Sequence, residues 1–211
     1  MKRFVAVCVF LFAIASVAPT PAEIMPDQTA HQVTDQIIGL IKANRDAYAA
    51  DYQKLYAMVD QHILPNFDFR KMAQQVLGPV WRQATEEQRT RFTKEFRELL
   101  VRTYATALLK YTNETIDYLP LKIVPGDRIA TVKSIVHRGG GAPTISINYS
   151  FYLADAGWKV YDMAIEGPSV VTTYKGVYAE RLQKQSLDAL IAELAQDNQR
   201  ALAANKTGAA K

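Results

Sequence analysis

The sequence predicts an α+β fold in which helices precede and follow a run of antiparallel strands. Apolar residues recur at helical spacing before residue 113, alternate as in strands over residues 115–165, and return to helical spacing afterwards. Short turns join the four predicted strands, which is typical of an antiparallel meander. Helices and strands that are segregated in this way indicate an α+β architecture.

The composition of the 211-residue chain is that of an ordinary globular protein. Apolar residues make up 49% and charged residues 22%, values that exclude the disordered and collagen-like classes. The formal net charge is +4, which is too small to indicate a nucleic-acid-binding protein. The length suits one compact domain with a core of its own.

The N-terminus has the order of features found in a secretory signal peptide. Two basic residues precede an apolar run over residues 4–17, and small residues and prolines follow up to Ala22. The run is shorter than the roughly 20 apolar residues that cross a bilayer. We predict that residues 1–22 are a signal peptide cleaved after Ala22, with cleavage after Ala18 as the alternative.

The mature chain lacks cysteine, because Cys8 lies inside the predicted signal. Disulfides and thiol catalysis are therefore excluded, and an exported domain must be held together by its core alone. A second apolar run that approaches 18 residues is absent. We expect a soluble domain over residues 23–202 and a flexible, small and polar tail over residues 203–211.

Three helices are predicted before the longest one. Thr29 and Gln32 form a capping box at the start of the first. The second ends before Pro65. The third covers residues 69–77 and ends at Gly78, which can take the left-handed cap position.

The longest predicted helix begins at Thr85, which forms a second capping box with Gln88. It runs for about seven turns and has one apolar face, while the opposite face is charged. The apolar face consists of Phe92, Phe96, Leu99, Leu100, Thr103, Tyr104, Ala107, Leu108 and Tyr111.

Four strands are predicted over residues 115–124, 129–137, 145–153 and 158–165. Pro120 lies within the first, which is typical of an edge strand or a bulge. The third strand alternates most clearly, and its odd-numbered residues place apolar side chains on one face. That face consists of Ile145, Ile147, Tyr149, Phe151 and Leu153. Helices over residues 170–182 and from Leu187 onward close the chain.

Catalytic and metal-binding motifs are missing from the sequence. His31, His62 and His137 are far apart and do not have the spacing of zinc ligands. The chain contains neither a nucleophile elbow nor a phosphate-binding loop. Asp162 is the best candidate for an acid, because an inward-facing carboxylate on a strand would have a raised pKa. An outward-facing carboxylate is the commoner arrangement.

Two stretches resemble a known family. The first reads ILPNFDFRKMA at residues 63–73 and continues as LGPVW at residues 77–81; the second reads GWKVYDMAIEG at residues 157–167. Together they resemble the MlaC family, also called the toluene-tolerance family, in the same order over nearly the whole mature chain. Departures are small: Pro168 stands where an aliphatic residue is usual, and Lys175 stands where arginine is common.

The resemblance implies a soluble periplasmic phospholipid carrier of a Gram-negative bacterium. It implies a twisted four-stranded antiparallel sheet, wrapped by about six or seven helices around a deep apolar lipid pocket. The implied partners are an outer-membrane lipoprotein–porin complex and an inner-membrane ABC transporter complex with an MCE-domain subunit. The family needs no cofactor and is not enzymatic, and it has hopanoid-associated relatives, so a hopanoid is an alternative cargo.

Apolar faces alone favour a solid core, because such faces usually pack against each other. The resemblance instead predicts a pocket between them. The predicted pocket residues are Phe69, Met72, Val76, Phe96, Leu100, Tyr104, Leu108, Tyr111, Ile147, Tyr149, Phe151, Val160, Met163, Ile165, Val170 and Tyr174. Two other hypotheses remain: an enzyme that uses Asp162 for proton transfer, and a solid adaptor that binds only proteins.

Overall fold

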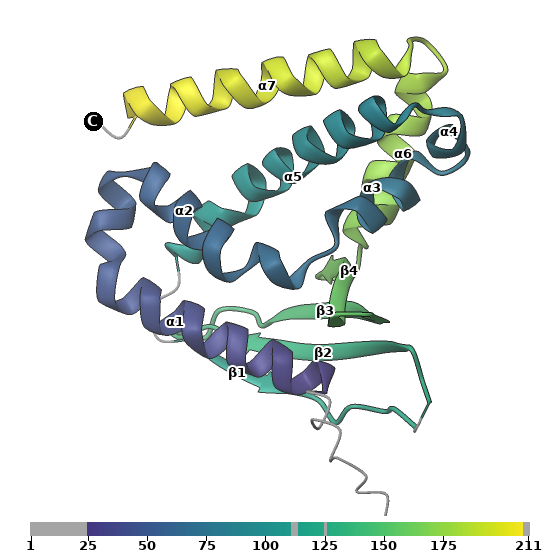
Figure 1. The fold of residues 1–211 in the computed structure, drawn as a ribbon. Coiled ribbons are helices and arrows are strands. Elements are labelled where there is room, and N and C mark those ends of the chain that lie inside the picture. The colour runs from purple at the N-terminus through teal and green to yellow at the C-terminus, as the bar shows by residue number, and fades with distance from the viewer. Residues whose placement is uncertain (1–24, 111–113, 125, 209–211) are drawn as a thin grey trace, which may run out of the picture.

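A computed structural model of the chain describes residues 25–110, 114–124 and 126–208. These residues form one four-stranded antiparallel sheet and seven α-helices, so the predicted α+β class is confirmed (Figure 1). The predicted signal peptide lies outside the described residues.

The elements follow one another in the order that the sequence predicts, with two short additions. The helices are α1 (Pro26–Ala50), α2 (Tyr52–His62), the 3-10 helix η1 (Leu64–Asn66), α3 (Phe69–Leu77), α4 (Pro79–Gln83), α5 (Glu86–Leu108), α6 (Val170–Leu182) and α7 (Leu187–Gly208). The strands are β1 (Thr115–Tyr118), β2 (Ile129–His137), β3 (Ile145–Ala154) and β4 (Gly157–Ile165).

The start of α1 differs from the prediction. The helix begins at Pro26, and the Gln28 side chain accepts a hydrogen bond from the backbone nitrogen of Met25 at 3.3 Å. Proline favours the first helical position because its fixed φ suits a helix and its missing N–H is not needed there. The capping box predicted at Thr29 is therefore wrong. Near its other end, α1 is kinked at Asn44, where φ is −131°.

The ends of α3 and α5 agree with local sequence rules. Gly78 ends α3 with a φ of +54°, a value that glycine adopts without steric cost. Thr85 and Gln88 form the predicted capping box of α5, with N–O distances of 3.0 and 3.2 Å. The five-residue α4 was not predicted, because one helical turn is too short to show periodicity.

The sheet is a simple meander in the order β1-β2-β3-β4, with each neighbouring pair antiparallel. β1 is a short edge strand that ends at Tyr118, before Pro120, because proline cannot donate to a strand ladder. β4 contains a bulge: Ser150 pairs with Asp162, but Phe151 pairs with Val160.

Three apolar clusters hold the fold together. The first joins α3, α5, α6 and α7; the second joins the inner face of the sheet to α1; and the third joins α1, α2 and α5. In Figure 1, α7 lies along α5 on the side away from the sheet. α7 extends to Gly208, beyond residue 202 where the sequence places the end of the domain; the flexibility of the tail stays a prediction.

Candidate functional site

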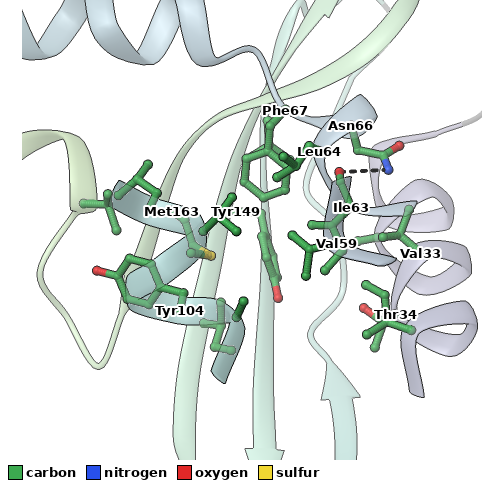
Figure 2. Close-up of a pocket in the computed structure, with 18 of the residues that line it drawn as sticks. Val33, Thr34, Val59, Ile63, Leu64, Asn66, Phe67, Tyr104, Tyr149 and Met163 are labelled. Carbon is green, nitrogen blue, oxygen red and sulfur yellow. Dashed lines mark hydrogen bonds between the residues drawn. The ribbon is translucent and has the colours of Figure 1, made fainter. Parts of the chain in front are cut away.

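An apolar cavity of about 280 Å³ lies between the sheet and the helices (Figure 2). Charged side chains are absent from its lining among the described residues. Its polar lining residues are Thr29, Thr34, Asn66, Tyr104 and Tyr149. The Asn66 amide is occupied, because it donates to the carbonyl oxygens of His62 and Ile63 at 3.1 and 3.3 Å.

β3 and β4 supply the sheet side of this cavity. Ile147, Tyr149 and Phe151 line it, as the two-residue period of β3 predicts. On β4, both Val160 and Met163 line the cavity although they are three residues apart. The bulge explains this, because its extra residue shifts the alternation of the strand beyond it by one position.

Most of the predicted pocket residues lie together around the cavity. The residues that line it are Phe69, Met72, Leu100, Tyr104, Leu108, Ile147, Tyr149, Phe151, Val160, Met163, Ile165 and Val170. Their contact with a lipid stays a prediction.

Four of the predicted residues are not placed on the cavity. Val76 and Phe96 are 2% and 0% exposed and belong to the cluster formed with α6 and α7. Tyr174 packs edge-on against Phe96, with ring centroids 5.3 Å apart. Val76 and Phe96 fill solid core because α6 and α7 cover the faces on which they lie, and the half-buried Tyr174 of α6 packs against that core. Tyr111 lies outside the described residues.

The sequence did not identify the side of the cavity formed by α1, α2 and η1. These elements contribute Thr29, Ala30, Val33, Thr34, Ile37, Val59, Ile63, Leu64, Asn66 and Phe67. The spacing of Val33 and Ile37 did reveal an apolar face on α1. The periodicity of a helix identifies such a face but does not specify what the face opposes.

The two tyrosines on the cavity remain neutral at physiological pH. Burial raises the pKa of Tyr149, and the neighbouring Tyr118 adds to the rise. The Tyr149 ring is nevertheless half-buried rather than fully packed, because it faces the hollow (Figure 2). Burial also raises the pKa of Tyr104, with a further contribution from Tyr174. The cavity is therefore an uncharged compartment.

Asp162 lies outside the cavity lining and has a structural environment. Its carboxylate accepts hydrogen bonds from the backbone nitrogens of Met163 at 2.8 Å and Val171 at 3.0 Å. It also accepts from the Ser169 hydroxyl at 2.5 Å. An acid at the start of a helix is stabilised by the helix dipole, so Asp162 anchors α6 to β4.

The three histidines lie apart, each beside a different partner. His31 contacts the Tyr118 ring, His62 bonds to Gln36, and His137 bonds to Asp117. Within the described ranges, no group of three histidine, cysteine or acidic residues could hold a metal ion. No helix in the same part of the chain is long and apolar enough to cross a membrane.

Comparison with known proteins identifies the family. The family model described as "MlaC protein" matches residues 31–196. The chain belongs to the MlaC family. It is 27% identical over 199 residues to the "Intermembrane phospholipid transport system binding protein MlaC" of Haemophilus influenzae, with 93% of each chain covered. It is also 25% identical over 166 residues to the "Toluene tolerance protein ttg2D" of Pseudomonas putida, with 76% of each chain covered.

A solved structure of a phospholipid-binding protein has the same fold. It is a phospholipid-binding protein from Ralstonia solanacearum in complex with a phospholipid. The two structures superpose with a TM-score of 0.76 and share 32% sequence identity. The match covers 82% of this chain and 97% of the Ralstonia chain.

Proposed function

We propose that this MlaC-family protein is a periplasmic phospholipid carrier that encloses acyl chains in the cavity between α1 and the sheet. The observation that carries the proposal is the uncharged, almost wholly apolar cavity, in a chain whose fold matches that of a phospholipid-bound protein. The family relatives named for phospholipid transport and toluene tolerance support the same function.

The energetics of lipid transfer suit such a cavity. Each methylene group that is kept from water contributes about 0.8 kcal/mol, so an acyl chain is strongly favoured in an apolar compartment. A neutral lining gives no fixed charge to hold the head group, so the chains supply most of the affinity. Release to a membrane then requires no ion pair to be broken.

A second part of the proposal concerns the two complexes with which the protein exchanges lipid. We propose that the protein exchanges phospholipid with an outer-membrane lipoprotein–porin complex and with an inner-membrane ABC transporter complex that has an MCE-domain subunit. The membership of the family and the predicted signal peptide support this route. The direction of transfer is not part of the proposal.

Mass spectrometry of an organic extract of the purified protein tests the carrier function. We expect phospholipid in a fixed ratio to protein, without any added cofactor. A hopanoid in the extract would support the alternative cargo. Repeatedly lipid-free extracts from gently purified protein would overturn the proposal and favour the adaptor or enzyme hypothesis.

A further inference from the structure

The N-terminal half of α1 forms part of one side of the cavity. Its lining residues are Thr29, Ala30, Val33, Thr34 and Ile37. The helix lies along the sheet in Figure 1, and in Figure 2 Val33 and Thr34 lie on the side of the cavity opposite Tyr104.

The cavity is small for a phospholipid. Its volume of about 280 Å³ is below the roughly 300–1,000 Å³ of pockets that enclose drug-sized ligands. A phospholipid with two acyl chains is larger than such ligands. Movement of one wall would enlarge the space for the acyl chains, and the hydrogen bonds around the cavity indicate which wall is held least.

The β4 edge of the sheet is fastened to the helices at several points. The backbone nitrogen of Asp68 donates to the carbonyl oxygen of Val160 at 2.8 Å. Lys159 Nζ donates to the carbonyl oxygen of Pro65 at 2.7 Å. Asp162 adds the bonds to the start of α6. Separation along this edge would break backbone and charged hydrogen bonds together.

At the opposite edge, the Tyr118 side chain of β1 joins the sheet to the first half of α1. The Tyr118 hydroxyl lies within hydrogen-bond distance of Thr34 Oγ1, at 2.7 Å, and of the carbonyl oxygen of Ala30, at 3.3 Å. The His31 ring lies against the Tyr118 ring, with centroids 3.7 Å apart. Both of these hydrogen bonds depend on one hydroxyl.

Two buried polar atoms near the contact between α1 and the sheet lack hydrogen-bond partners among the described residues. Asp27 Oδ1, in the first turn of α1, is buried and has no hydrogen-bond partner among the described residues. The same holds for Trp158 Nε1, whose side chain packs in one cluster with Ala30. Buried polar atoms without partners disfavour the state that buries them. These two atoms reduce the stability of the closed position of α1.

Gly39 lies at the boundary between the part of α1 that lines the cavity and the part that packs against α2 and α5. It follows Ile37, the last residue of α1 on the cavity, and precedes Ile41, which is 2% exposed in the cluster with α2 and α5. A Cβ at Gly39 would meet no atom within 4 Å, so packing does not require the glycine. Glycine in the middle of a helix weakens it, because more backbone freedom is lost on folding.

We propose that lipid enters and leaves between α1 and β1, and that the first half of α1 swings away from the sheet about Gly39. Tyr118 is the positioning residue that holds this portal closed. The inference rests on the proposed carrier function, since it concerns the passage of the same lipid.

The first test removes the Tyr118 hydroxyl that bonds to α1. Tyr118→Phe protein is loaded with phosphatidylethanolamine that carries a fluorescent acyl chain, and transfer to vesicles of phosphatidylethanolamine and phosphatidylglycerol is followed by stopped flow. Loss of one net hydrogen bond predicts transfer that is about 2- to 12-fold faster. Tyr152→Phe is the matched control, because the Tyr152 hydroxyl also joins the sheet to a helix, through Asp68 on the fastened edge. It should transfer lipid at the wild-type rate.

The second test makes the α1 helix more stable at residue 39, where we propose that it bends. Gly39→Ala should slow transfer by about 2- to 5-fold, because alanine favours the helix at this position. Gly176→Ala is the control: Gly176 lies in α6, and a Cβ there would also meet no atom within 4 Å. Both changes stabilise a helix, but only the first should alter the transfer rate.

The outcomes separate the two proposals. Proteins that hold the labelled lipid but all transfer it at one rate would overturn the portal while leaving the carrier function standing. Equal acceleration in Tyr118→Phe and Tyr152→Phe would also overturn it, because the rate would then follow stability alone. A wild-type protein that never takes up the labelled lipid would overturn the carrier function itself.

Discussion

Ile147 shows how single residues divide the interior into cavity and packed core. It pairs with Ile165 across the β3–β4 ladder, and both side chains line the cavity. Val76, also a buried aliphatic residue, instead lies in solid core and is 2% exposed. Enlarging the two side chains should therefore have opposite consequences.

Ile147→Trp should place the larger side chain in the space for an acyl chain. We expect less phospholipid per protein and a nearly unchanged melting temperature of the delipidated protein. Val76→Trp should overpack the core and cost about 1–3 kcal/mol, while lipid content per folded protein is retained. Lipid quantification and calorimetry on both variants check this; a large loss of stability in Ile147→Trp with normal lipid content would show that Ile147 is ordinary core.

Tyr149 and Tyr152 contribute to the response of the protein to alkaline pH. The folded state raises the pKa of Tyr149 above its ordinary value near 10, chiefly by burial. It raises the pKa of Tyr152 to about 12 by burial and by the hydrogen bond to Asp68. Above pH 10 the unfolded chain releases these protons while the folded protein retains them, so rising pH favours unfolding.

The contribution of these tyrosines to the free energy of unfolding should therefore be constant below pH 10. It should fall between pH 10 and 12. One tyrosine contributes a slope of up to about 1.4 kcal/mol per pH unit. Urea denaturation across this range should give a shallower fall for Tyr149→Phe than for the wild type. Equal slopes would contradict the role of Tyr149.

At the scale of elements, the bulge in β4 connects the cavity to the attachment of α6. It brings Met163 onto the cavity face. Its neighbour Asp162 then points to the start of α6, where Ser169 and Val171 donate to it. One local irregularity thus positions a cavity residue and a helix anchor together.

Asp162→Asn should weaken this anchor, because an amide accepts hydrogen bonds less strongly than a carboxylate and does not complement the helix dipole. We expect a loss of about 1–3 kcal/mol in the free energy of unfolding. Asp117→Asn is the control, since its partner is the exposed His137, and an exposed pair contributes less than about 1 kcal/mol. Equal losses in urea denaturation would contradict the anchor.

At the scale of the whole molecule, the interior is assembled from three clusters that leave a cavity between them. Empty apolar space forgoes dispersion contacts that a packed core would make. A ligand that fills it and does not bind the unfolded chain stabilises the fold by mass action.

Delipidation should therefore lower the melting temperature. A ligand at 100 times its dissociation constant contributes about 2.7 kcal/mol. Calorimetry before and after organic extraction should show the decrease, and addition of phospholipid should reverse it. An unchanged melting temperature would indicate that lipid does not occupy the folded interior.

Export is the remaining prediction at this scale. The order of basic, apolar and small residues before Ala22 predicts a mature N-terminus near Glu23. Mass spectrometry of protein from the periplasm of its native host should find this end. Intact residues 1–22 on that protein would contradict the signal peptide.

The sequence by itself determined the local structure. The bounds of β2 and α3 and the cap at Thr85 agree with the prediction, because strand alternation, helical period and capping depend on neighbours along the chain. The resemblance to the MlaC family added the prediction of a pocket, which apolar patterning alone disfavours.

Only the tertiary structure decided which apolar faces meet and which leave a space. Val76 and Phe96 lie on faces that the sequence identifies, yet they pack in the core under α6 and α7, and Tyr174 of α6 packs against that core. The wall formed by α1 and the shifted alternation of β4 were equally hidden. A period specifies which residues share a face, whereas the partner of that face depends on how distant segments pack together.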